Sequence, residues 1–285
     1  MKNSIKRYSY LLPNRGSILI VTMWVLICFS ILSIGLYRVV SSRIKVTEVM
    51  THRIIGQYLA KAACAYFKVI RKTDKTPYDT LTELSTPEEQ ELGRGKFKYI
   101  LKDEESKINI NKASVDMISR LPGFSKDTAK NVFESKLKPF KAIEQLLLID
   151  GVDEGILDKC KGLITVYGNG SVNINTASPE VFKALGIDEG LVSIIMDLRR
   201  GPDGKEGTAD DVAFENKDRI MEDLRSKTSL YEEQQAKLLQ LTSQNMLSVI
   251  SDTFTLDIET TVLEKPAMRY NIVMEKGKIK RWTEI

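Results

Sequence analysis

The sequence predicts an α+β fold in which one long N-terminal helix packs on a small antiparallel sheet that carries a large, mainly helical insertion. Three observations lead to this prediction. Apolar and then amphipathic patterning runs from residue 17 to 72 without a proline. Alternating apolar and polar residues, typical of strands, occur at 96–101 and again after residue 250. Between them, residues 107–249 show short helical patterns separated by Gly-containing turns.

Composition limits the classes of function. The net charge of +4 over 285 residues is too small an excess to indicate a nucleic-acid partner, which clustered Lys and Arg would. The chain has one histidine, and its three cysteines are far apart in a spacing that fits neither zinc nor a disulfide framework. We expect the cysteines to act as small apolar side chains. No nucleophile and base stand in a catalytic pattern, so the sequence predicts no enzyme and no catalytic residue.

The first element is an apolar helix. No charged residue lies between Gly16 and Tyr37, and a run of this length spans a bilayer as a helix. The run is too long for a cleaved signal peptide, and no A-x-A-like site follows it. Four basic residues and no acidic residue precede it, which favours a cytoplasmic N-terminus. We therefore expect a transmembrane half at 17–40 and an amphipathic soluble half at 41–72.

The junction before the apolar run resembles the type IV prepilin cleavage site. A short basic leader, 1–16, ends in Gly16, and the apolar helix follows at once. In that family the prepilin peptidase cuts after the Gly and methylates the new N-terminus, so the resemblance implies cleavage after Gly16 and methylation of Ser17. Most pilins carry a Glu as the fifth mature residue, whereas this chain has Val21. The alternative is a plain signal-anchor helix with an incidental glycine.

Two segments of the insertion match at a spacing of 64 residues. They are 107–114 and 172–179, and each runs from a strand-like piece into Asn-x-Ala-Ser. Ser114 and Ser178 are expected to cap the helices that follow, and Pro179 takes the favoured first helical position. The turns beyond resemble helix-hairpin-helix units, each with a Gly that can take a positive φ. These glycines are Gly123, Gly151 and Gly186.

Helix-hairpin-helix units suggest DNA binding as one possible use. In DNA-binding versions, hairpin amides and a nearby Lys hold a phosphate, and Lys126 is placed for that role. Acidic residues crowd the hairpins, however, and the second Gly of the phosphate-gripping form is absent. We therefore expect the hairpins to be structural, with nucleic acid disfavoured as a partner.

Residues 201–211 form a Gly-rich loop dense in hard oxygen donors. Calcium takes six to eight oxygens in flexible geometry, and a loop of this kind can wrap one ion. The order of residues is not that of an EF-hand, so spacing alone leaves a solvated turn as an equal alternative. A transition metal is disfavoured because no sulfur or imidazole is available in the loop. The acidic residues of the loop are Asp203, Glu206, Asp210 and Asp211.

The sheet is predicted from strand patterns on both sides of the insertion. We assign the sheet region to 73–106 and 250–285, and the inserted domain to 107–249. Residues 73–95 are polar and contain two prolines, so we expect a loop packed against the long helix. The predicted strands are 96–101, 253–260, 268–274 and 278–282.

Together these features resemble the K-type minor pseudopilin of the type II (general) secretion system. The resemblance lies in the Gly16 leader without a Glu at Val21, the Asp-Glu-Glu-Ser-Lys-Ile-Asn-Ile-Asn segment at 103–111, the repeat at 172–178 and the acidic loop. It implies a pilin-like fold with a calcium-binding helical insertion. It also implies a structural role, without catalysis, at the tip of the periplasmic pseudopilus. The loop carboxylates named above are the calcium ligands that it suggests.

The same resemblance implies partners and a location. The partners are two other minor pseudopilins at the tip and the inner-membrane secretion assembly, with the prepilin peptidase as processing enzyme. The location is the bacterial inner membrane, crossed once, with the N-terminus cytoplasmic and the soluble domain in the periplasm. The alternative function is a membrane-anchored helix-hairpin-helix DNA receptor of the competence type. Such receptors usually have a flexible linker after the anchor, which this chain lacks.

Overall fold

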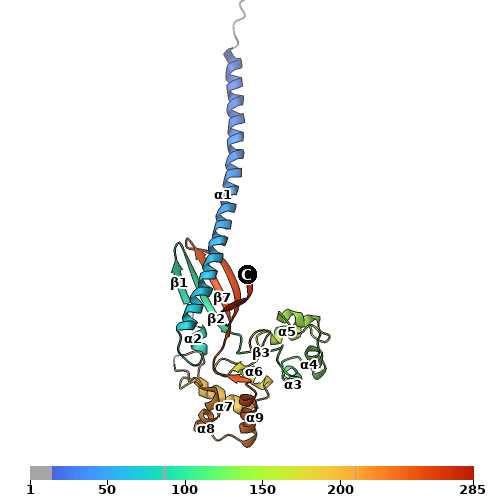
Figure 1. Ribbon diagram of the computed structural model, residues 1–285. Coiled ribbons are helices and arrows are strands. Elements are labelled where there is room, and N and C mark those ends of the chain that lie inside the picture. Colours follow the sequence, from blue (N-terminus) through green and yellow to red (C-terminus); the bar gives the residue numbers. More distant parts are fainter. Residues whose placement is uncertain (1–14, 86–87, 209) are drawn as a thin grey trace, which may run out of the picture. The chain divides into compact units, whose positions relative to one another are not determined.

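The computed structural model describes residues 15–85, 88–208 and 210–285, and Figure 1 shows the order of elements along the chain. Helix α1 (Arg15–Thr73) confirms the predicted long helix. Contacts divide the chain into two compact units, 1–54 and 55–285. In the first unit the apolar side chains of α1 from Ile18 onward are exposed, and in the described part of the chain this is the one helix long and apolar enough to cross a membrane.

The second unit contains a five-stranded antiparallel sheet in the order β1-β2-β7-β8-β9. Inward-facing residues alternate along its central strands, since Leu256 and Ile258 of β7 are buried while Glu259 is exposed. The predicted strands are confirmed, and the α+β class with them. The strands are β1 (Glu88–Leu92), β2 (Gly95–Asp103), β7 (Thr253–Val262), β8 (Lys265–Glu275) and β9 (Lys278–Glu284).

The C-terminal part of α1 packs on this sheet within the second unit. Leu59, Cys64 and Phe67 are buried on one side of the helix, in the same apolar cluster as the sheet residues Tyr99 and Phe254. The Phe67 and Phe254 rings meet edge to face with centroids 5.5 Å apart. The amphipathic pattern of the helix therefore has its apolar stripe against the sheet.

The prediction of a loop at 73–95 is wrong. Helix α2 (Leu81–Ser85) and strand β1 lie in this segment. Thr80 and Glu83 cap α2 reciprocally, each side chain accepting the other's backbone N–H at 3.3 Å. Strand β1 has almost no apolar residue, because it is an edge strand held by its ladder with β2 rather than by burial. A pattern search for alternating apolar residues misses such a strand.

The insertion consists of two repeats with the same plan. In the first repeat (108–166), strand β3 pairs in parallel with β4 after two helical hairpins. In the second repeat (172–249), β5 pairs in parallel with β6 in the same way. The first repeat contains β3 (Ile108–Asn109), α3 (Val115–Ser119), α4 (Lys126–Phe133), the 3-10 helix η1 (Ile143–Leu148), α5 (Glu154–Cys160) and β4 (Ile164–Thr165). The second contains β5 (Val172–Asn173), α6 (Pro179–Ala184), α7 (Glu189–Arg199), the 3-10 helix η2 (Lys217–Arg219), α8 (Ile220–Lys227), α9 (Glu232–Ser243) and β6 (Leu247–Ser248).

The hairpin glycines and one of the two predicted caps are confirmed. Gly123, Gly151 and Gly186 have φ values of +84°, +87° and +83°. The Ser114 side chain caps α3 by accepting from the Met117 amide. Ser178 occupies the N-cap of α6, but its buried hydroxyl makes no hydrogen bond there. Apolar side chains from both repeats form one continuous core beneath these turns.

Candidate functional site

One asparagine in each repeat makes the same three hydrogen bonds. Asn111 Nδ2 donates to the Phe140 and Val166 carbonyls at 2.9 and 3.1 Å, and its Oδ1 accepts from the Phe140 amide at 2.7 Å. Asn175 makes the matching bonds to Phe214 at 3.0 and 2.8 Å, and to the Val249 carbonyl at 3.4 Å. The match in sequence is therefore a match in structure, with each asparagine tying the start of its repeat to the middle and the end.

The acidic loop lies where the two repeats differ in length. The amide that Asn111 holds is 29 residues further along the chain, whereas the one that Asn175 holds is 39 residues further. The extra residues follow helix α7 and contain the loop 201–211. The loop is therefore an insertion into the common plan of the repeat rather than a part of it.

Asn109 and Asn173, two positions before these asparagines, have different hydrogen-bond partners in the two repeats. Asn109 and Asn173 each accept the amide of the asparagine two residues on, at 3.0 Å. Asn109 Nδ2 then donates to the Tyr167 and Gly168 carbonyls, directly after the end of its own repeat. Asn173 Nδ2 instead donates to Asp103 Oδ2 at 3.3 Å and to Ser251 Oγ at 3.0 Å. The second repeat is thus bonded to the last residue of β2 and to the segment just before β7.

Three consecutive buried carboxylates mark the point where the sheet continues into the insertion. Asp103 Oδ2 accepts from the Thr176 and Ser251 hydroxyls at 2.6 and 2.7 Å. Glu105 Oε1 accepts from the Thr253 hydroxyl at 3.0 Å. Burial raises the pKa of Asp103 to about 6 and that of Glu105 to about 7.

The carboxylate between them is held in its charged form. Glu104 Oε1 pairs with Lys107 at 2.8 Å, and its two oxygens accept from the Thr165 and Thr255 hydroxyls at 2.6 and 2.7 Å. Burial works against the charge, but the Lys107 ammonium and these hydrogen bonds lower the pKa of Glu104. The three acids of this junction (103–105) therefore differ in pKa although they are neighbours in sequence.

This junction predicts an unusual dependence of stability on pH. The pKa of Asp103 rises from its ordinary value of 3.8 to about 6 in the folded state, so the folded protein binds a proton that the unfolded chain releases. The contribution of Asp103 to stability should be fully present below the ordinary value and should fall, by about 3 kcal/mol in all, as pH rises from about 4 through 6. The measurement is the free energy of unfolding between pH 4 and 8. Asp103→Asn should remove the Asp103 part of this fall and leave the part due to Glu105, whose pKa is also raised, to about 7. An equally steep profile in the variant would contradict the assignment.

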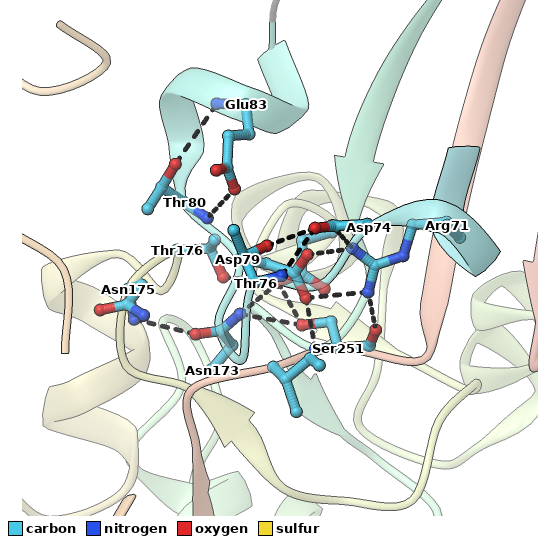
Figure 2. A network of polar contacts seen from close by, with 12 residues as sticks. Arg71, Asp74, Thr76, Asp79, Thr80, Glu83, Asn173, Asn175, Thr176 and Ser251 are labelled. Atoms are coloured by element: carbon cyan, nitrogen blue, oxygen red, sulfur yellow. Dashed lines mark hydrogen bonds and ion pairs between the residues drawn. The ribbon is translucent and has the colours of Figure 1, made fainter. Parts of the chain in front are cut away.

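An ion pair joins the end of α1 to the same junction. Arg71 pairs with the buried Asp79 through both guanidinium nitrogens and donates to the Ser251 carbonyl at 3.0 Å. The Ser251 amide donates to Asp79 Oδ2 at 2.8 Å. Figure 2 shows Arg71 and Asp79 facing each other, with Ser251 beside them and Asn173 close by. Ser251 therefore connects α1, the strand end at Asp103 and the second repeat, and we call these residues the Ser251 network.

The acidic loop is closed by its own carboxylates. Asp210 accepts from the Thr208 hydroxyl at 2.8 Å and from the Asp203 amide at 3.0 Å. Asp211 accepts from the Gly207 amide at 2.7 Å and from the Thr208 hydroxyl at 3.3 Å. The Thr208 hydroxyl therefore bonds to the carboxylates of both Asp210 and Asp211.

The other two predicted ligands lie differently. Asp203 Oδ1 accepts the Lys205 amide at 2.7 Å, which makes a local turn. Glu206 pairs at 3.0 Å with Arg199, whose side chain is buried and also donates to the Ala177 carbonyl. Within 15–85, 88–208 and 210–285, no three acidic, His or Cys side chains are gathered closely enough to hold a metal ion. The loop offers the oxygen donors that calcium prefers, with one of the four engaged by an arginine.

The remaining predicted site residues lie at the N-terminus. The leader 1–16 falls, up to residue 14, outside the described residues. Gly16 and Ser17 belong to the first turn of α1. Further along, Cys64 and Cys160 are buried, and burial raises the pKa of each thiol to about 11, which keeps both in the unreactive protonated form.

Comparison with known proteins agrees with this geometry. Residues 103–165, the first repeat with its junction, match the model of the Helix-hairpin-helix motif family. Endonuclease/exonuclease/phosphatase family domain-containing protein 1 is 30% identical over 126 residues in Danio rerio, covering 36% of this chain and 23% of the relative. The Homo sapiens protein is 28% identical over 138 residues, covering 36% and 24%. The chain thus spans about a quarter of the length of these relatives.

A solved structure matches nearly the whole fold. A chain in the crystal structure of the GspK-GspI-GspJ complex from the enterotoxigenic Escherichia coli Type 2 Secretion System superposes with a TM-score of 0.57. The match covers 84% of this chain and 95% of that one at 17% identity. The protein therefore has a pilin-like α+β fold with a long apolar N-terminal helix and a helical insertion in its antiparallel sheet.

Proposed function

We propose that the protein is a minor pseudopilin of a type II secretion system, with a structural role and no catalysis. The observation that carries the proposal is the structural match, because it covers the helix, the sheet and the insertion together rather than one motif. In this function α1 anchors the protein in the inner membrane, with the N-terminus cytoplasmic and the second unit in the periplasm.

A position at the tip of the pseudopilus is supported by two features. Val21 stands where most pilins have a Glu, and a lone carboxylate in lipid is costly without a charge to meet it. A tip subunit has no subunit ahead of it and needs no such carboxylate. The large insertion between β2 and β7 also gives this chain bulk that would obstruct a further subunit stacked on it.

Processing by a prepilin peptidase is the first test. The full chain should be recovered from membranes containing the peptidase with a mature N-terminus at Ser17, methylated on its amine, because the basic leader ends in Gly16. Intact mass and N-terminal sequencing measure this. Gly16→Leu should leave the leader in place, while Gly35→Leu, in the same helix but far from the site, should be cut normally. A wild-type chain that starts at Met1, while a control prepilin is cut, would overturn the proposal.

Assembly is the second test and is independent of cleavage. The full chain, co-expressed with pseudopilins of the GspI and GspJ kinds from one secretion system, should co-purify with both in a defined ratio. A chain that is processed but binds neither would be pilin-like without being part of this tip complex.

We also propose that the loop 201–211 binds calcium. Asp203, Asp210 and Asp211 would supply the carboxylates, and Glu206 could join them only by leaving Arg199. When bound, the ion would neutralise the crowded carboxylates and fix the loop that closes on Thr208.

Calcium should therefore stabilise the protein. At an ion concentration of a hundred times the dissociation constant, the expected gain is about 2.7 kcal/mol in the free energy of unfolding. Thermal melting with calcium and with a chelator measures it. Asp211→Asn should reduce the gain, whereas Asp218→Asn, an exposed acid in η2, should keep it. Equal melting with and without calcium would argue for a solvated turn.

A DNA-binding function is the second candidate, favoured by the helix-hairpin-helix match over 103–165. In that case a DNA duplex should bind with strong salt dependence, and Lys126→Ala should weaken it. The acidic residues beside each hairpin oppose this function.

A further inference from the structure

Two basic side chains from different repeats converge on the Gly186 hairpin. A Cβ built on Gly186 would lie 3.0 Å from Arg120 Nη1 and 3.0 Å from Lys237 Nζ. Arg120 follows helix α3 of the first repeat, and Lys237 belongs to α9 of the second. Gly186 also has a φ of +83°, so both its backbone and the space beside it are suited to glycine alone. The two cations are therefore held close together by three separate segments of the fold.

Neither cation has an acidic partner in the described residues. Asp116 and Glu233 lie four positions before Arg120 and Lys237, but neither forms an ion pair with them. The nearby Lys183 has its own partner, Glu189, at 2.8 Å. Burial lowers the pKa of Lys237, and the charge of Arg120 lowers it further. Two like charges placed together without a counter-charge repel each other, and an anion from outside the chain would relieve that repulsion.

The first repeat shows that a hairpin of this plan does not require cations. Its corresponding glycine is Gly123, with a φ of +84°. A Cβ built there would meet the apolar side chain of Ile156, from α5, at 3.2 Å. The same position of the fold is thus covered by a hydrocarbon in one repeat and by two cations in the other. Packing of the hairpin explains the first arrangement but leaves the second unexplained.

We propose that Arg120 and Lys237 form a docking site for a carboxylate side chain of a protein partner. An arginine and a lysine side by side supply several N–H donors and two positive charges, the combination that a carboxylate accepts best. The charge pattern favours a single carboxylate over a nucleic acid. Acidic residues adjoin each of the three segments in sequence, namely Asp116, Asp188 and Glu233, and would oppose a backbone with closely spaced phosphates. The inference concerns this face alone and does not depend on the proposed role in secretion.

The test uses the full chain in detergent micelles and fluorescein-labelled peptides. The probe is a Ser-rich peptide with blocked termini and one central Glu, with the matching peptide that has Gln in its place as the neutral control. Fluorescence anisotropy should show saturable binding of the Glu peptide only. The double variant Arg120→Met/Lys237→Met should weaken that binding about tenfold, since two charge pairs are lost. The variant Lys136→Met/Lys159→Met removes two exposed lysines of the first repeat, with the same change in net charge, and should bind as the wild type does.

Two further measurements distinguish a loss of peptide binding from misfolding of the variant. The conservative variants Arg120→Lys and Lys237→Arg should retain binding. Without peptide, Arg120→Met/Lys237→Met should melt at or above the wild-type temperature, because it removes a repulsion. Equal peptide binding by this variant and the wild type, or no binding of the Glu peptide by the wild type, would overturn the proposal. So would a labelled DNA duplex that binds more tightly than the peptide and is lost in the variant, which would assign the pair to nucleic acid.

Discussion

Replacing Asn175 with alanine should lower the free energy of unfolding by about 3–5 kcal/mol. The change removes the partners of the Phe214 amide and carbonyl in a buried place, and each unsatisfied buried group costs about 1–3 kcal/mol. Asn111→Ala should have a similar effect, because it frees the same two groups of Phe140. Denaturant unfolding in a Trp24→Phe background, followed by the fluorescence of Trp282, measures both.

The control for this experiment is Asn131→Ala. Asn131 is exposed and makes one bond, from Nδ2 to the Asp150 carbonyl at 3.1 Å, so its loss should cost less than about 1 kcal/mol. If Asn175→Ala cost no more than this control, the paired asparagines would not be the ties that hold the repeats closed. A large loss in only one repeat would show that the two copies no longer have equal roles.

Replacing Arg71 with methionine should destabilise the second unit by about 3–5 kcal/mol. The substitution keeps most of the hydrocarbon of the side chain but leaves Asp79, which is 1% exposed, without its cation. It also removes the hydrogen bond to the Ser251 carbonyl. The same denaturant experiment measures the loss.

A matched ion pair on the surface provides the comparison. Lys102 pairs with Asp257 at 2.6 Å, but its side chain is 62% exposed, so Lys102→Met should cost less than about 1 kcal/mol. Adding Asp79→Asn to Arg71→Met should recover part of the lost stability, because the unpaired charge disappears. Equal losses from Arg71→Met and Lys102→Met would mean that the Ser251 network does not depend on this pair.

Most of the fold could be predicted because its signals are local. The length of the apolar run and the alternation in β2 and β7 depend on residues within one turn or one strand, and so do the glycines of the hairpins. Strand β1 could not be found in this way, since an edge strand needs no apolar face. The capping pair of Thr80 and Glu83 was a local signal for α2 that the sequence did contain.

The junction could not be predicted because its partners are distant in sequence. Three consecutive acids normally indicate a solvated turn, yet Asp103 meets Thr176 across 73 residues and Ser251 across 148. The acidic loop could be predicted as a cluster of oxygen donors. The pairing of Glu206 with Arg199 could not, because nothing in the spacing distinguishes a free carboxylate from one held by a buried arginine.

The place of the insertion in the sheet has a consequence for how the chain folds. Strands β2 and β7 are direct neighbours, with Asp103 opposite Phe254, yet the whole insertion separates them. An unfolded segment of roughly 150 residues makes this pairing slow, because the entropy of closing the loop is lost before any strand contact forms. Once the two repeats have folded, their parallel strand pairs bring the first and last residues of each repeat together. The insertion should therefore fold first. The rate at which the five-stranded sheet forms should depend on this insertion, although it contributes no strand to that sheet.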